Sequence, residues 1–297
     1  MRITKFDGVM CALITPYDKK GMIDVEMLRK HTNYVIENGV DTVLAVGGSG
    51  QYTNMDYAQR EVGVKAVVAE AKGRVPVIAG VLEPGLGEAI KNGKMCKDAG
   101  ADALLVLPPY YVGITQQGIY EYFQVLDQEL NTPIVVYNYP YRTGTNIMPE
   151  TLVRMMREIP GVFGVKECAD FAQFLNLVRL LGDDGTIFSG SDLMFADQVA
   201  AGAKGGVLAA SCILPRQYAE IYRHAKGGDL KKAHKVIFRC FALVKALFGD
   251  GLHPAPLKYA MSLSGQEAGE WYPPVVEPNE EMKNLLRTEL EKLGMLV

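Results

Sequence analysis

Short apolar runs alternate with amphipathic stretches over about the first 210 residues of the chain. The apolar runs are rich in β-branched residues, as buried strands are, and cover residues 9–15, 42–46, 75–79, 103–107, 134–137, 162–166, 186–189 and 206–210. Between them, apolar side chains recur at helical spacing in residues 25–37, 58–71, 87–99, 118–130, 149–158, 171–181 and 193–201. This alternation predicts parallel strands joined by crossover helices.

The number of predicted strands favours a closed barrel over an open sheet. Eight strands in this length fit a (β/α)8 barrel, which usually takes ~250 residues. A doubly wound sheet would usually have fewer strands and a glycine-rich turn after the first, where this chain has Thr15-Pro16-Tyr17-Asp18. The rest of the chain predicts helices only, at residues 216–226, 230–248, 257–263 and 280–293. We therefore expect an α/β fold, a TIM barrel at residues 1–214 with a C-terminal helical appendage at 215–297.

Composition narrows the classes of function. The net charge is -3 and no run of Lys or Arg stands out, which argues against nucleic acid and anionic membranes as partners. No apolar run approaches the ~18 residues of a membrane span. The first seven residues lack the apolar core of a signal peptide, so we expect a cytoplasmic protein. Five scattered cysteines without a CxxC pair, and four dispersed histidines without HExxH, predict reduced thiols, no metal site and no cofactor.

Lys166 is the residue that the apolar pattern does not explain. It closes the run at 162–166, where packing in a parallel sheet calls for an apolar side chain. The ammonium group of a lone lysine at such a place usually reaches out into water. Held at the mouth of a barrel instead, it would favour the neutral amine, which attacks carbonyl groups and forms Schiff bases. The other strand ends decide between these two interpretations.

The other predicted strand ends carry polar groups that suit imine chemistry. Each has an ordinary interpretation: Gly47-Gly48-Ser49-Gly50 as a flexible turn, Tyr137 as a core aromatic and Arg142 as a solvated loop residue. All of them lie at the face of a barrel where active sites are built. A backbone N–H nest with the Ser49 hydroxyl can hold a carboxylate, a phenol can transfer protons, and an arginine can bind a second carboxylate. Together with Lys166 they predict a site for a 2-oxo acid.

Five motifs at these strand ends resemble those of the family of dihydrodipicolinate synthase and N-acetylneuraminate lyase, over the whole chain length. They read Gly-Gly-Ser-Gly at 47–50, Leu-Pro-Pro-Tyr-Tyr at 107–111, Tyr-Asn-Tyr-Pro at 137–140, Gly-Val-Lys-Glu at 164–167 and Ser-Gly-Ser-Asp at 189–192. The resemblance implies a class I, Schiff-base aldolase that uses pyruvate and an aldehyde. It also implies a homotetramer, built as a pair of dimers.

The resemblance also implies a role for each matching residue. Lys166 falls at the Schiff-base lysine, Tyr137 at the proton-relay tyrosine, and Tyr111 at the tyrosine that crosses a dimer interface into the neighbouring site. Ser49 falls at a hydroxyl that holds the pyruvate carboxylate, and Arg142 at the arginine that receives the second substrate's carboxylate in the synthases. The remaining expected substrate-binding positions are Gly48, Gly50, Gly190 and Val207.

The chain departs from the family pattern at two places. Gly48 stands where the family has a relay hydroxyl, and Gln51 stands for its glutamate, so Ser49 or water would have to complete the relay. After the third run, Gly80-Val-Leu-Glu-Pro84 replaces the usual turn, which makes feedback control by lysine doubtful.

Four functions are compatible with this sequence. The space at Gly48 favours a lyase that cleaves or forms a bulky 2-oxo acid with pyruvate as the imine-bound partner. The alternative is dihydrodipicolinate synthase, favoured by Tyr-Arg-Thr-Gly at 141–144. A family dehydratase or deaminase also fits, as does a catalytically silent ligand-binding barrel, which only Gly48 and Gln51 favour.

Overall fold

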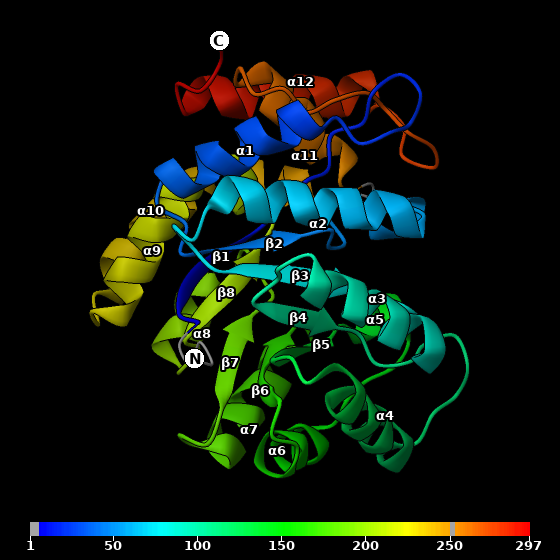
Figure 1. Cartoon of the computed structure of the whole chain (residues 1–297). Coiled ribbons are helices and arrows are strands. Elements are labelled where there is room, and N and C mark those ends of the chain that lie inside the picture. The colour runs from blue at the N-terminus through cyan, green and yellow to red at the C-terminus, as the bar shows by residue number, and fades with distance from the viewer. Residues whose placement is uncertain (1–5, 250–252) are drawn as a thin grey trace.

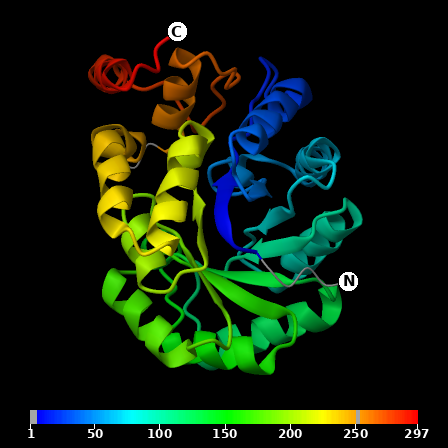
Figure 2. The same cartoon turned by 90° about the vertical axis from the view of Figure 1, so that its left-hand side faces the viewer.

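The computed structural model describes residues 6–249 and 253–297. Eight parallel strands form a closed barrel in sequence order, and helices surround it (Figures 1 and 2). The strands are β1 (Gly8–Ala12), β2 (Thr42–Ala45), β3 (Val77–Val81), β4 (Ala103–Val106), β5 (Ile134–Asn138), β6 (Val162–Glu167), β7 (Thr186–Ser189) and β8 (Gly205–Leu208). The prediction of a (β/α)8 TIM barrel is confirmed.

The helices that cover the barrel occupy the predicted amphipathic stretches. They are α1 (Val25–Glu37), α2 (Tyr57–Ala71), α3 (Leu86–Asp98), α4 (Gln116–Leu130), α6 (Pro149–Glu158), α7 (Phe171–Leu181) and α8 (Phe195–Ala200). Many start at side-chain caps: the Asp24, Asp56, Thr115 and Asp170 side chains each accept a backbone N–H of the first turn. Such caps satisfy N–H groups that would otherwise lack partners, which fixes where each helix begins.

Three short helical turns were not predicted. They are η1 (Tyr52–Asn54), α5 (Pro140–Thr143) and η2 (Ala210–Cys212), and each follows the C-terminal end of a strand. They are too short for a periodic apolar pattern, which is why the sequence did not indicate them. The eighth predicted strand also ends earlier than expected, at Leu208, because the chain turns into η2.

The barrel closes where β8 pairs with β1, and this contact depends on glycine. Gly205 is the register partner of Gly8. A Cβ atom on Gly205 would lie 2.1 Å from the Gly8 carbonyl oxygen, so any larger residue would push the two strands apart. The backbones of the first and last strands can therefore approach closely enough to pair.

The C-terminal region consists of α9 (Pro215–Lys226), α10 (Leu230–Leu247), α11 (Ala255–Leu263) and α12 (Glu280–Lys292). Helix α9 follows β8 and packs against β1 and α8, while α11 and α12 pack on each other and on α10. In both views α11 and α12 lie at the same end of the molecule as α1 (Figures 1 and 2). The division of the chain after residue 214 stays a prediction.

Several expectations from composition can be compared with the structure. No helix in the described part of the chain is long and apolar enough to cross a membrane. The five cysteines are free, and all but Cys168 are buried. The prediction that the chain lacks a signal peptide rests mostly on residues 1–5, and these lie outside the described residues.

Candidate active site

The centre of the candidate site is formed by Lys166 and Tyr137, which face each other on adjacent strands. Tyr137 of β5 and Lys166 of β6 are register partners, and Lys166 Nζ donates to Tyr137 Oη over 3.3 Å. Both side chains are buried, at 8% and 7% relative exposure, so the lysine does not reach out into bulk water. The interpretation of Lys166 as a solvated strand end is therefore wrong, and the amine lies within reach of a proton donor.

The Tyr137 phenol is neutral at physiological pH. Burial is the main cause that raises its pKa well above the usual value, and the charge of Arg142 opposes the shift only in part. A neutral phenol beside an amine can donate a proton to a group that reacts with that amine. The Tyr137 ring is held in place by stacking on Tyr139, with centroids 5.7 Å apart.

A buried polar network supports the ends of β5 and β6. Asn138 donates to both carboxylate oxygens of Glu167, over 3.0 and 3.1 Å, and accepts from the Ile147 backbone N–H. Glu167 also accepts from the Ala169 backbone N–H at 2.7 Å. Because Asn138 and Glu167 directly follow Tyr137 and Lys166 and are themselves register partners, this network fixes how the two reacting side chains are presented.

Ser49 lies at the end of β2 in a turn built from glycines. A Cβ atom on Gly50 would lie 2.9 Å from Thr15 Oγ1, so glycine lets the turn pack against the end of β1. A Cβ atom on Gly48 would meet nothing within 4 Å, so the space that the sequence analysis expected there exists. The Ser49 hydroxyl is 3.0 Å from His253 Nε2 and makes no hydrogen bond to Tyr137 among the described residues.

The ends of β7 and β8 carry Gly190, Asp192 and Val207. A Cβ atom on Gly190 would lie 1.9 Å from the Cys168 sulfur, so glycine is required where β6 and β7 end. Val207 is buried in β8. The Asp192 carboxylate accepts the Ala210 backbone N–H at 2.8 Å and ties the end of β7 to η2.

Asp192 is a buried acid whose ionised form, present at neutral pH, lowers the stability of the folded protein. Burial raises the pKa of its carboxyl from 3.8 to about 6, although the Ala210 hydrogen bond and the positive charge of Lys166 oppose the shift. The folded chain therefore holds a proton between about pH 4 and 6 that the unfolded chain has already lost. Stability contributed by this group is full below pH 4 and is lost as the pH rises through 6.

We expect Asp192→Asn to raise the free energy of unfolding at pH 8 by on the order of 2 kcal/mol, because the amide oxygen still accepts from Ala210 and no buried charge remains. At pH 4 the variant and the wild type should be equally stable. Urea unfolding at both pH values measures this. A variant that is less stable than wild type at pH 8 would contradict the assignment of the cost to the Asp192 charge.

Arg142 and Tyr111 lie on the exposed side of the site. Arg142 belongs to α5, the short turn after β5, and its positive charge lowers the pKa values of Tyr137 and His253. Tyr111 follows β4, is 96% exposed and has a φ of 80°, a strained value for a residue other than glycine. The structure thus brings Lys166 and Tyr137 into contact, whereas the Tyr111 side chain projects into solvent.

Sequence reasoning missed four residues of this site: His253, Asp192, Asn138 and Glu167. Asn138, Glu167 and Asp192 lie inside motifs that the sequence analysis quoted, so their position at strand ends was a usable signal. His253 gave no such signal, because it lies 204 positions from Ser49 and only the fold joins them.

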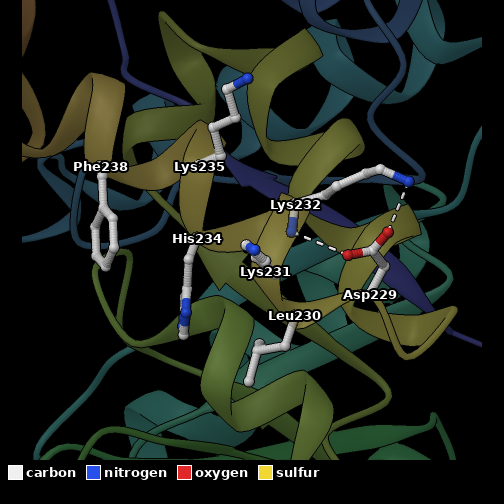
Figure 3. Close-up of a pocket in the computed structure, with 7 residues that line it drawn as sticks. All are labelled: Asp229, Leu230, Lys231, Lys232, His234, Lys235 and Phe238. Atoms are coloured by element: carbon white, nitrogen blue, oxygen red, sulfur yellow. Dashed lines mark hydrogen bonds and ion pairs between the residues drawn. The ribbon is translucent and has the colours of Figure 1, made fainter.

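A hollow lies along α10, outside the barrel. It is lined by Asp229, Leu230, Lys231, Lys232, His234, Lys235 and Phe238, all from α10 and its N-cap, and none from a strand end (Figure 3). Lys232 pairs with Asp229 at 2.7 Å, and His234 with Asp197 at 2.9 Å. Among the described residues no group of three or more His, Cys, Asp or Glu side chains is arranged to hold a metal ion, here or at the barrel mouth.

Comparisons with known proteins identify the family of the chain. The model of the dihydrodipicolinate synthetase family matches residues 5–293. The 4-hydroxy-tetrahydrodipicolinate synthase of Methanocaldococcus jannaschii is 35% identical over 292 residues, which cover 98% of this chain and 100% of the relative.

Solved structures give the same picture. Dihydrodipicolinate synthase from Thermotoga maritima superposes with a TM-score of 0.94 at 32% identity, over 98% of this chain and 99% of its own. A monomeric dihydrodipicolinate synthase variant gives a TM-score of 0.95 at 32% identity, over 100% and 99%. These relatives favour the synthase, which was the alternative in the sequence analysis, over the bulky-acceptor lyase that Gly48 suggested.

Proposed function

Since the chain belongs to the dihydrodipicolinate synthetase family, whose members are class I, Schiff-base-forming carbon–carbon lyases, we propose that it is a 4-hydroxy-tetrahydrodipicolinate synthase that condenses pyruvate with aspartate semialdehyde. The observation that carries the proposal is the buried contact of Lys166 Nζ with Tyr137 Oη at 3.3 Å. This contact places a nucleophilic amine and a proton donor at one point of the barrel mouth.

In the proposed reaction, the neutral Lys166 amine attacks C2 of pyruvate, and a C–N bond forms as the carbonyl π bond breaks. The resulting carbinolamine loses its hydroxyl as water when Tyr137 supplies a proton, which leaves an imine. The Tyr137 phenolate left by this step takes a proton from the pyruvate methyl group, which gives an enamine. The enamine carbon attacks the aldehyde carbon, whose oxygen takes the proton back from Tyr137, and the amino group of the aldehyde substrate then displaces Lys166 from C2 and frees its amine. The Ser49 hydroxyl and the backbone N–H groups of its turn would hold the pyruvate carboxylate.

Arg142 would receive the carboxylate of the aldehyde substrate. Its side chain is exposed on α5 and makes no ion pair with a described residue. A guanidinium that is free to bind a carboxylate in a bidentate manner suits a second acidic substrate. This is the feature that separates a synthase for aspartate semialdehyde from a lyase for uncharged aldehydes.

The synthase proposal is tested by product formation from pyruvate and aspartate semialdehyde, compared with a panel of pyruvate and sugar aldehydes. We expect the first pair to be the better substrates by kcat/KM. Turnover of the sugar aldehydes without turnover of aspartate semialdehyde would overturn the proposal.

The bulky-acceptor lyase remains the second candidate because of the open space at Gly48. We expect Gly48→Thr to fill this space and to reduce any activity with a bulky acceptor more than activity with aspartate semialdehyde. Parallel assays of both reactions measure the ratio. An unchanged ratio would remove Gly48 as a determinant of specificity.

A homotetramer built as a pair of dimers is also part of the proposal. Tyr111 and Val112 are exposed at 96% and 63%, and they line a surface pocket together with the segment from Thr143 to Asn146. Exposed apolar groups gathered at one loop are typical of an interface, and a neighbouring chain would bury them. Light scattering at micromolar concentration measures the oligomeric state, and a fully active monomer would contradict the proposed tetramer.

We also propose a cytoplasmic location for the protein, and cell fractionation measures this location.

A further inference from the structure

We propose that His253 is a positioning residue of the 2-oxo-acid site, which it serves by holding the Ser49 hydroxyl. The inference rests on the proposed function at one point, which is that the substrate carboxylate binds at Ser49. His253 comes from the C-terminal region, just before α11, and brings its Nε2 atom to 3.0 Å from Ser49 Oγ at the end of β2. Ser49 has no other side-chain hydrogen bond among the described residues.

The imidazole is held in place by packing rather than by charge. Its ring stacks on Phe248, with centroids 5.1 Å apart and planes inclined by 26°. Its Nδ1 atom is buried and makes no hydrogen bond of ordinary geometry with any residue in the described ranges. The contact with Ser49 is therefore the polar interaction that fixes the rotation of the ring within the plane in which it stacks on Phe248.

His253 remains neutral when the site is ready for substrate. Burial lowers the pKa of its imidazole to about 4; the nearby positive charges of Arg142 and Lys166 add to this shift, and only the Leu247 backbone carbonyl opposes it. A neutral imidazole carries one N–H and one lone pair, so it can either donate to a hydroxyl or accept from it. In its neutral form it adds no positive charge of its own to the site.

The direction of the hydrogen bond follows from the ligand. Ser49 has a single hydroxyl hydrogen, and a bound carboxylate can only accept hydrogen bonds. When the carboxylate takes this hydrogen, His253 Nε2 must be the donor to Ser49 Oγ. The Leu247 backbone carbonyl, which opposes the shift of the pKa, makes no hydrogen bond of ordinary geometry with Nδ1, so a bound carboxylate can select the tautomer that carries its hydrogen on Nε2. With its hydrogen on Nε2, the imidazole leaves the Ser49 hydroxyl hydrogen free for the bound carboxylate.

The test measures how much pyruvate is needed to form the borohydride-reduced adduct on Lys166, so it does not depend on the second substrate. His253→Phe keeps the ring that stacks on Phe248 and removes both nitrogens, and His253→Leu replaces it if the Phe variant does not fold. We expect the half-saturating pyruvate concentration to rise roughly three- to tenfold, as for the loss of one hydrogen bond. His253→Gln, which restores a donor at the reach of Nε2, should recover most of the loss.

A double-mutant cycle with Ser49→Ala separates positioning from a general structural role. Without the Ser49 hydroxyl, His253→Phe should cost little more, because the two residues act through one contact. An unchanged pyruvate requirement in His253→Phe, or the same cost with and without Ser49, would overturn the inference. A wild-type chain that forms the adduct but gives no product with aspartate semialdehyde would overturn the synthase proposal alone. A wild-type chain that forms no adduct would overturn both.

Discussion

Lys166→Ala should abolish covalent trapping of pyruvate and reduce condensation to the uncatalysed rate. In the wild type, pyruvate followed by borohydride should add one reduced pyruvyl group per chain, because an imine on Lys166 is fixed as a stable amine. Intact mass of both proteins, followed by peptide mapping, measures this. The removed side chain is buried, so the melting temperature of the variant should be measured beside the adduct.

Lys258 provides an internal control for this result. It is the other buried lysine of the described residues, and burial lowers the pKa of its ammonium to about 8, so it too could supply a free amine. Its Nζ donates to the Glu270 carbonyl at 2.7 Å and lies 5.3 Å from the Trp271 ring. We therefore expect no adduct there. A pyruvyl group on Lys258, or one that persists in Lys166→Ala, would contradict the assignment of Lys166 as the nucleophile.

Tyr137→Phe should lower the rate of condensation by ~10²–10⁴-fold, the usual contribution of a positioned proton donor. The fold should be retained, because the variant keeps the buried ring and its stacking on Tyr139 and removes only the hydroxyl that contacts Lys166. Steady-state kinetics and thermal unfolding of the same preparation measure both expectations.

Tyr139→Phe is the matched control for the proton donor. Tyr139 lies two residues further along, stacks on the same ring and has no hydrogen bond from its hydroxyl to another described residue. We expect its removal to leave the rate within a few-fold of wild type. If Tyr137→Phe is as active as Tyr139→Phe, the proton must come from another group and Tyr137 has no part in the chemistry.

Local pattern was sufficient to predict most of the barrel. A parallel strand that is buried on both faces is mostly apolar, so β2 and β4 appear directly as apolar runs in the sequence. Helices α1 and α7 follow a periodic apolar stripe and begin after a capping aspartate, and their bounds were predicted to the residue. The short turns after the strands lack such a period, and they were missed.

The sequence by itself determined the closed barrel and the place of Lys166, because burial on both faces of a parallel strand imposes a pattern that an out-of-place lysine breaks. Only the tertiary structure decided what surrounds Lys166. The Ser49–His253 contact joins residues 204 positions apart, and the exposure of Tyr111 depends on how the β4 end is packed. Such contacts arise when the strand ends converge and the C-terminal helices settle on the barrel, and no local periodicity records them.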